Sequence, residues 1–182
     1  LKYHRLGDDP AKDVEIFREE DDGFRVDVGL SAQEDYLVLA TGDNVTSEVY
    51  IVPASDPLAK PLLVRERKAG VQYSVDIRDR QIFVLANDDH VNFRLAKAPL
   101  DNPGDWQTVI PGSDQVYLTG FDLFRDFFVT EARVDGLDQI ELRQYDNPLE
   151  AKRIPFPEAS YDAGMGDNPE YDVQKLRLSY QS

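Results

Sequence analysis

Hydrophobic and polar residues alternate with a period close to two along nearly the whole chain. The clearest runs are short and rich in β-branched and aromatic residues: 24–28 (FRVDV), 49–52 (VYIV), 73–77 (YSVDI) and 175–180 (KLRLSY). Gly, Pro, Asn and Asp interrupt the pattern about every 8–12 residues, which is the spacing of short antiparallel strands. The pattern therefore predicts an all-β chain.

Two segments have some helical character. Residues 10–13 could hold about one turn, and residues 122–126 could hold another. Neither has the sustained i, i+3, i+4 pattern of a long helix. We therefore expect no helical layer.

An internal repeat is the strongest feature of the sequence. The second strand of each repeating unit recurs at Leu37, Ile82, Phe127 and Leu176, with spacings of 45, 45 and 49 residues. Turn residues follow the third strands, at 53–57 (PASDP), 101–103 (DNP) and 146–148 (DNP). Four short strands at this period are typical of a β-propeller blade. The alternative is an ordinary sandwich in which the spacing is accidental.

The repeat divides the chain into about four blades' worth of four-stranded antiparallel sheets. The predicted full blades are residues 24–70, 71–115 and 116–159, residues 1–23 are the end of a preceding blade, and residues 160–182 are the start of the next. Half-blades leave strand edges unpaired. These edges would pair with each other to close a small ring, or be covered by symmetry mates. Because the chain begins at Leu1, we expect the partial β-propeller 1–182 to be a piece of a longer protein.

Composition narrows the possible functions. The chain has no cysteine, so disulfides, zinc–thiolate sites and thiol nucleophiles are excluded within it. A net charge of −15 argues against nucleic acid and anionic lipid as partners. No apolar run approaches the roughly 20 residues that cross a bilayer, and no signal peptide is recognisable. We expect the cytoplasm, with the periplasm as the alternative.

Catalytic motifs are missing, and we predict no catalytic residue and no cofactor in the chain. There is no Gly-x-Ser-x-Gly nucleophile elbow and no phosphate-binding glycine-rich loop. His90 lies in a loop, where a packing role is favoured over catalysis. The acidic clusters 88–90 and 19–22 do not match a calcium loop, so we interpret them as solvated turns and predict no metal site.

One set of acidic residues is a candidate functional group. First strands of propeller blades line the central channel, and Asp27, Asp76, and Asp122 or Asp162 fall on or near these strands. Carboxylates around a channel of low dielectric would attract cations or basic peptides. The alternative is that some of these acids cap turns or point between blades.

Several segments, taken in order, resemble the propeller domain of the prolyl oligopeptidase family, and specifically its oligopeptidase B (protease II) branch. They are residues 4–7 (HRLG), 13–17 (DVEIF), 19–22 (EEDD), 24–26 (FRV), 46–49 (TSEV), 71–76 (VQYSVD), 92–95 (NFRL) and 176–180 (LRLSY). The resemblance covers essentially all 182 residues. Its motifs are structural, so it transfers no catalytic residue.

The resemblance implies one part of a two-domain serine peptidase. In that family a seven-bladed propeller caps an α/β-hydrolase domain and admits only short peptides to a Ser-Asp-His triad. The oligopeptidase B branch cleaves after Lys or Arg, so the implied partners are the parent's own catalytic domain and short basic peptides. The alternative function is a stand-alone propeller that binds proteins or small ligands.

Overall fold

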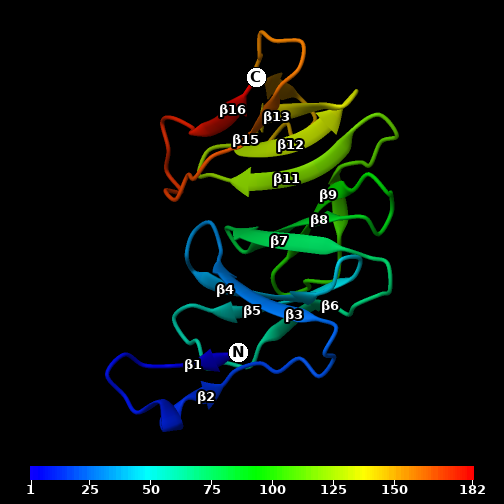
Figure 1. The fold of residues 1–182 in the computed structure, drawn as a ribbon. Coiled ribbons are helices and arrows are strands. Elements are labelled where there is room, and N and C mark those ends of the chain that lie inside the picture. The colour runs from blue at the N-terminus through cyan, green and yellow to red at the C-terminus, as the bar shows by residue number, and fades with distance from the viewer.

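The computed structural model describes residues 1–182 and is built almost entirely of strands. The strands form three four-stranded sheets and two two-stranded sheets, all antiparallel. The only helical element is a 3₁₀ turn, Pro10–Lys12. Figure 1 shows the sheets following one another from the N-terminal to the C-terminal end of the molecule. The predicted all-β propeller architecture is confirmed.

Each four-stranded sheet contains four consecutive strands in sequence order. The first sheet comprises β3 (Arg25–Leu30), β4 (Tyr36–Gly42), β5 (Ser47–Pro53) and β6 (Leu62–Arg65). The second comprises β7 (Tyr73–Arg78), β8 (Gln81–Ala86), β9 (Arg94–Pro99) and β10 (Gln107–Ile110). The third comprises β11 (Tyr117–Leu123), β12 (Phe128–Val134), β13 (Leu137–Arg143) and β14 (Ala151–Arg153).

The hydrophobic core lies between neighbouring sheets. Strand β8 shows how, because it is buried on both faces. Ile82 and Val84 belong to the cluster shared with the first sheet, while Phe83 and Leu85 belong to the cluster shared with the third. An all-apolar run in place of strict alternation is the expected sequence of a strand covered on both sides. Face-to-face packing of this kind fixes the positions of the inner strands.

The two helical predictions had different outcomes. Residues 10–12 form the 3₁₀ turn, and the Asp9 side chain caps it by accepting a hydrogen bond from the Ala11 amide at 3.0 Å. The prediction of a helical turn at residues 122–126 is wrong. Asp122 and Leu123 complete β11, and Leu123 pairs with Phe128 across a hairpin. Burial of both of these apolar side chains in one cluster favours the strand pairing over a helix.

The two ends of the chain form half-sheets. Strand β1 (Lys2–Tyr3) pairs only with β2 (Val14–Glu15), and β15 (Asp162–Met165) pairs only with β16 (Leu178–Gln181). The two half-sheets lie at opposite ends of the molecule (Figure 1). The edges of the two half-sheets therefore do not pair, and no ring is closed within the chain. Strands β1 and β2 fall within residues 1–23, the predicted end of a preceding blade.

Candidate functional site

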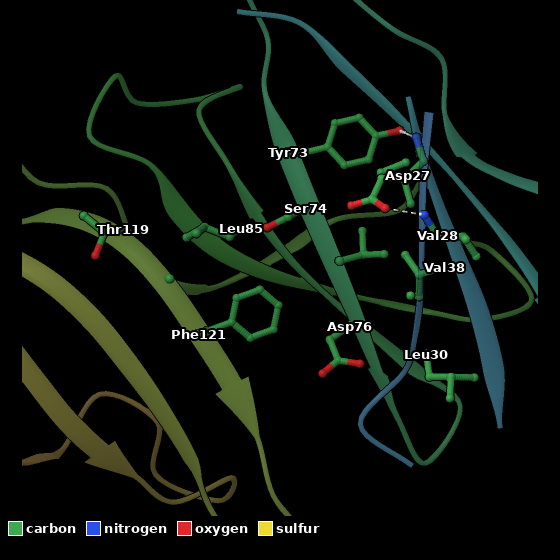
Figure 2. A pocket seen from close by; sticks show the side chains of 15 residues that line it. Asp27, Val28, Leu30, Val38, Tyr73, Ser74, Asp76, Leu85, Thr119 and Phe121 are labelled. Atoms are coloured by element: carbon green, nitrogen blue, oxygen red, sulfur yellow. Dashed lines mark hydrogen bonds between the residues drawn. The ribbon is translucent and has the colours of Figure 1, made fainter. Parts of the chain in front are cut away.

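The inner strands β3, β7 and β11 border a cavity of about 410 Å³. Asp27 and Asp76 line it from β3 and β7, and Phe121 lines it from β11 (Figure 2). Val28 and Leu30 contribute an apolar wall. The inner strands therefore enclose a space in which carboxylates stand beside apolar side chains.

A second, more acidic cavity of about 270 Å³ lies where the inner strands end. Asp76 and Asp122 line it from β7 and β11. Glu34 comes from the β3–β4 turn, and Glu170 and Tyr171 come from the long β15–β16 loop. Asp76 and Leu30 border both cavities, so the two cavities adjoin at these residues.

Asp76 is held in place by backbone amides. Its Oδ1 accepts hydrogen bonds from Ala32 N at 2.8 Å and from Ile77 N at 2.7 Å. Burial raises the pKa of Asp76 to about 6, against the two amide bonds, and the charges of Asp122 and Asp35 add to the increase. Ionisation of Asp76 at neutral pH therefore costs free energy, and a cation bound nearby would offset this cost.

Asp122 lies near the end of β11, the inner strand of the next blade. Asp76 stands two residues before the closing pair of its hairpin, Arg78–Gln81, and Asp122 stands immediately before the closing pair Leu123–Phe128. Burial raises the pKa of Asp122, and the charge of Glu131 adds to the effect. No hydrogen bond from the chain reaches the Asp122 carboxylate, so it is free to bind a cationic group.

The other two predicted acids lie elsewhere. In the first blade the hairpin closes with the pair Leu30–Leu37, and Asp27 lies three residues before it. Asp27 is exposed and accepts a hydrogen bond from Val28 N at 2.8 Å. Asp162 is the exposed first residue of β15 and lines neither cavity. The structure thus brings together Asp76 and Asp122, with Asp27 at the far side of the larger cavity.

Glu34, Glu170 and Tyr171 were not identified from the sequence. They belong to turns, where the sequence has no strand-like periodicity. These turns reach the cavity only through contacts between blades. Glu34 has a positive φ of 58°, which marks a tight turn, but its sequence offers no glycine or Asn-Gly to reveal it. No sequence signal would have placed these three residues beside Asp76.

The acidic clusters considered for metal binding are engaged in other contacts. Asp88 receives bonds from Arg94 Nε and Nη2, both at 2.9 Å, and from Arg65 Nη1 at 3.1 Å. His90 Nε2 lies 3.2 Å from Asp114, and its Nδ1 accepts from the Asn92 amide. No group of three or more His, Asp or Glu side chains is close enough to hold a metal ion. The interpretation of residue 88 as a solvated turn is therefore wrong, because its carboxylate bridges two arginines.

Comparison with known proteins identifies the architecture. The family model described as the prolyl oligopeptidase N-terminal β-propeller domain matches residues 1–182. The chain belongs to this family. No helix in the structure is long and apolar enough to cross a membrane.

Individual members of the family match over the whole chain. The chain is 30% identical to dipeptidyl aminopeptidase BI of Pseudoxanthomonas mexicana and 29% identical to protease 2 of Moraxella lacunata, and it covers 25% and 26% of their lengths. Oligopeptidase B from Trypanosoma brucei, solved in a closed form with covalently bound antipain, superimposes with a TM-score of 0.95 at 26% identity over 27% of its chain. Oligopeptidase B from Leishmania major gives 0.92 at 22% identity. The chain spans about a quarter of the length of these relatives and corresponds to part of their N-terminal propeller.

Proposed function

We propose that the chain is part of the substrate-filtering cap of a serine oligopeptidase that hydrolyses short peptides after Lys or Arg. Its partner in this role is the α/β-hydrolase domain of the same parent protein. Membership of the propeller family supports the cap role. The observation that carries the preference for basic peptides is the placement of Asp76 and Asp122 on neighbouring inner strands, where both border the smaller cavity.

The electrostatics of this pair favour a cationic ligand. Both carboxylates border the smaller cavity, and burial raises the pKa of each. A lysine or arginine side chain of a peptide would offset the cost of ionising them. Glu34 and Glu170 add negative charge at the same cavity, so the local field attracts basic peptides.

Kinetics on the full-length parent protein test this proposal. Asp76→Asn and Asp122→Asn should each raise KM for a dibasic peptide about threefold or more at low salt, with a smaller effect at high salt. Turnover of a peptide with one basic residue at the scissile bond and none elsewhere should change less. The matched control is Asp162→Asn, because Asp162 is exposed and lies outside both cavities.

Two results would contradict the proposal. An unchanged KM for the dibasic peptide in both variants would contradict the role of Asp76 and Asp122 in attracting basic peptides. Failure of the full-length protein to cleave any peptide after Lys or Arg would contradict the peptidase assignment itself. The 182-residue chain alone should show no hydrolysis, since the segments that carry the family's triad lie outside it.

A further inference from the structure

Trp106 fills the space between the outer strands of the first two blades. It immediately precedes β10, the outer strand of the second blade, and only 8% of its surface is exposed. The guanidinium of Arg65, the last residue of β6, lies 3.4 Å from the centre of the Trp106 ring. The indole Nε1 donates to the Pro103 carbonyl at 2.9 Å. An aromatic side chain covered by a cation therefore closes this junction on its outer side.

The outer strands of the second and third blades pair in the same way. Thr108 of β10 pairs with Ala96 of β9, and Arg153 of β14 pairs with Glu141 of β13, 45 positions later in each case. Both pairs face the preceding blade, because Ala96 belongs to the cluster shared with the first blade, and Glu141 and Arg153 line a cavity with Ile110 of the second. An offset of 45 residues therefore relates equivalent places in the two junctions.

This offset places Ala151 where Trp106 stands in the first junction. It also places Ile110 where Arg65 stands, and these two residues end β10 and β6. Ala151 and Ile110 both line a cavity of about 350 Å³ between the second and third blades. We call it the outer-wall cavity. It lies where the indole ring and its covering cation lie in the first junction.

The walls of the outer-wall cavity are apolar and belong to complete sheets. Leu118 and Ala132 line it from β11 and β12, and Leu149, which is 66% exposed, lies at its edge. The strands that border it, β10 to β14, lie in the four-stranded sheets of two complete blades. An apolar cavity beside an exposed leucine is a place where a side chain from outside the fold can be buried.

The charged side chains at this cavity carry a net positive charge. Glu141 accepts hydrogen bonds from the guanidinium groups of both Arg143 and Arg153. One carboxylate between two guanidiniums leaves one positive charge, although the chain as a whole carries −15. Arg143 is buried, whereas the Arg153 side chain is 53% exposed. Arg153 is therefore available to cover an inserted ring, as Arg65 does, and to attract an acidic group beside that ring.

We propose that the outer-wall cavity is a docking site for a partner protein, which inserts a tryptophan side chain from a segment with an acidic residue next to it. The chain itself contains the model for this ligand, since Asp105 immediately precedes the Trp106 that fills the first junction. The inference does not rest on the proposed peptidase function, because the outer-wall cavity shares no lining residue with the two cavities at the inner strands.

Binding of a peptide to the full-length parent protein tests the site. The probe is a fluorescently labelled synthetic peptide with the sequence of residues 100–107 (LDNPGDWQ), and its anisotropy should show saturable binding. The same peptide with Trp106→Ala should bind at least about tenfold more weakly, because a buried tryptophan contributes much of the affinity of such contacts. Absence of saturable binding at millimolar peptide would overturn the proposal.

Ala151→Trp in the protein should fill the outer-wall cavity from within the chain. Peptide binding should fall at least about tenfold, and the melting temperature should rise, because the added ring gains apolar contacts. Unchanged peptide binding in this variant would show that the peptide binds elsewhere, which would overturn the site.

Arg153→Gln tests the acidic part of the ligand without changing the apolar walls. It should weaken binding of the peptide about threefold, and it should weaken a peptide with Asp105→Asn less. The matched control is Lys152→Gln, because Lys152 is the neighbouring cation on β14 and does not line the cavity. Equal weakening of the two peptides by Arg153→Gln would overturn the pairing of Arg153 with an acidic residue.

Competition by free indole-3-acetate separates a protein partner from a small aromatic acid. The free acid should displace the labelled peptide only at concentrations at least about tenfold above those of unlabelled peptide, because it lacks the flanking residues. Displacement at equal concentrations would overturn the assignment to a protein partner.

Discussion

The Glu19 carboxylate lies 2.6 Å from Nη2 of Arg67, although the two residues are 48 positions apart. The same Nη2 lies 3.0 Å from Glu48 Oε1, and the Thr41 hydroxyl donates to Glu19 at 2.7 Å. The Arg67 guanidinium also lies 4.3 Å from the centre of the Phe24 ring. This network joins the segment before the first full blade to the connection that follows it.

Glu19→Gln should make the protein less stable at neutral pH, by about 1–3 kcal/mol, because a charge-assisted pair in a largely buried site is lost. The hydrogen bond from Arg67 lowers the pKa of Glu19 from its usual 4.5 to about 2, against the opposing effect of burial. The stabilisation is therefore complete above about pH 4.5 and is lost as pH falls toward 2. When the pH is lowered from 7 to 3, denaturant unfolding should show a smaller loss of unfolding free energy for Glu19→Gln than for wild type.

Glu15→Gln is the control for this experiment. Glu15 pairs with Arg18, but both side chains are well exposed, so the unfolding free energy should hardly change. An equal loss of stability in the Glu15 and Glu19 variants would show that the Arg67 network has no special role.

Asp76→Asn should raise stability at neutral pH, by on the order of 1–2 kcal/mol. Asn retains an oxygen acceptor for the amides of Ala32 and Ile77 and removes the buried charge beside Asp122. Because the folded-state pKa is raised from 3.8 to about 6, the wild type is most stable relative to the variant below pH 3.8 and loses that advantage as pH rises through 6. Thermal unfolding at pH 4 and pH 7.5 checks this, and a variant destabilised equally at both values would contradict it.

The sequence predicted the repeat better than it predicted the site. Leu37 and Ile82 lie in β4 and β8 as expected, whereas Phe127 and Leu176 stand just before β12 and β16. The spacing of apolar residues locates the strands, because strands packed between blades need apolar side chains at regular positions. This spacing does not specify where each hairpin closes. Asp27 lies three residues before the closing pair Leu30–Leu37, whereas Asp76 lies two residues before the closing pair Arg78–Gln81, and a period of two does not specify these distances.

The remaining residues of the site depend on contacts between blades. Glu170 and Tyr171 line the smaller cavity because the long β15–β16 loop meets the turn 124–127, where the Arg125 amide donates to the Tyr171 carbonyl. Loop conformation of this kind is set by distant partners and leaves no periodic pattern. The sequence could therefore name the channel acids Asp76 and Asp122 but not the groups that surround them.

Gly112→Ala should destabilise the protein by about 1–3 kcal/mol through overpacking. A Cβ at this position would stand 2.2 Å from His90 Cβ and 3.0 Å from the Phe93 carbonyl, so the two loops would have to move apart. Gly29→Ala is the control, because its Cβ would meet no atom within 4 Å. Chemical denaturation should give a lower unfolding free energy for Gly112→Ala than for Gly29→Ala. Combining His90→Gly with Gly112→Ala should restore part of the lost unfolding free energy. Equal stability of the two single variants would argue against close packing at His90.

Asp88→Asn should lower the melting temperature, whereas Asp89→Asn at the neighbouring exposed position should not. Burial opposes ionisation of Asp88, but the hydrogen bond and charge of Arg94, with the charge of Arg65, bring its pKa below the usual 3.8. The carboxylate therefore joins β6 of the first blade to β9 of the second. The Arg65 guanidinium also stacks 3.4 Å from the centre of the Trp106 ring. Loss of a partly buried charged partner costs about 1–3 kcal/mol. Millimolar calcium should leave the melting temperature of wild type unchanged, because the oxygens of Asp88 are already bound by arginines. A calcium-dependent rise that Asp88→Asn abolishes would instead make this loop a metal site.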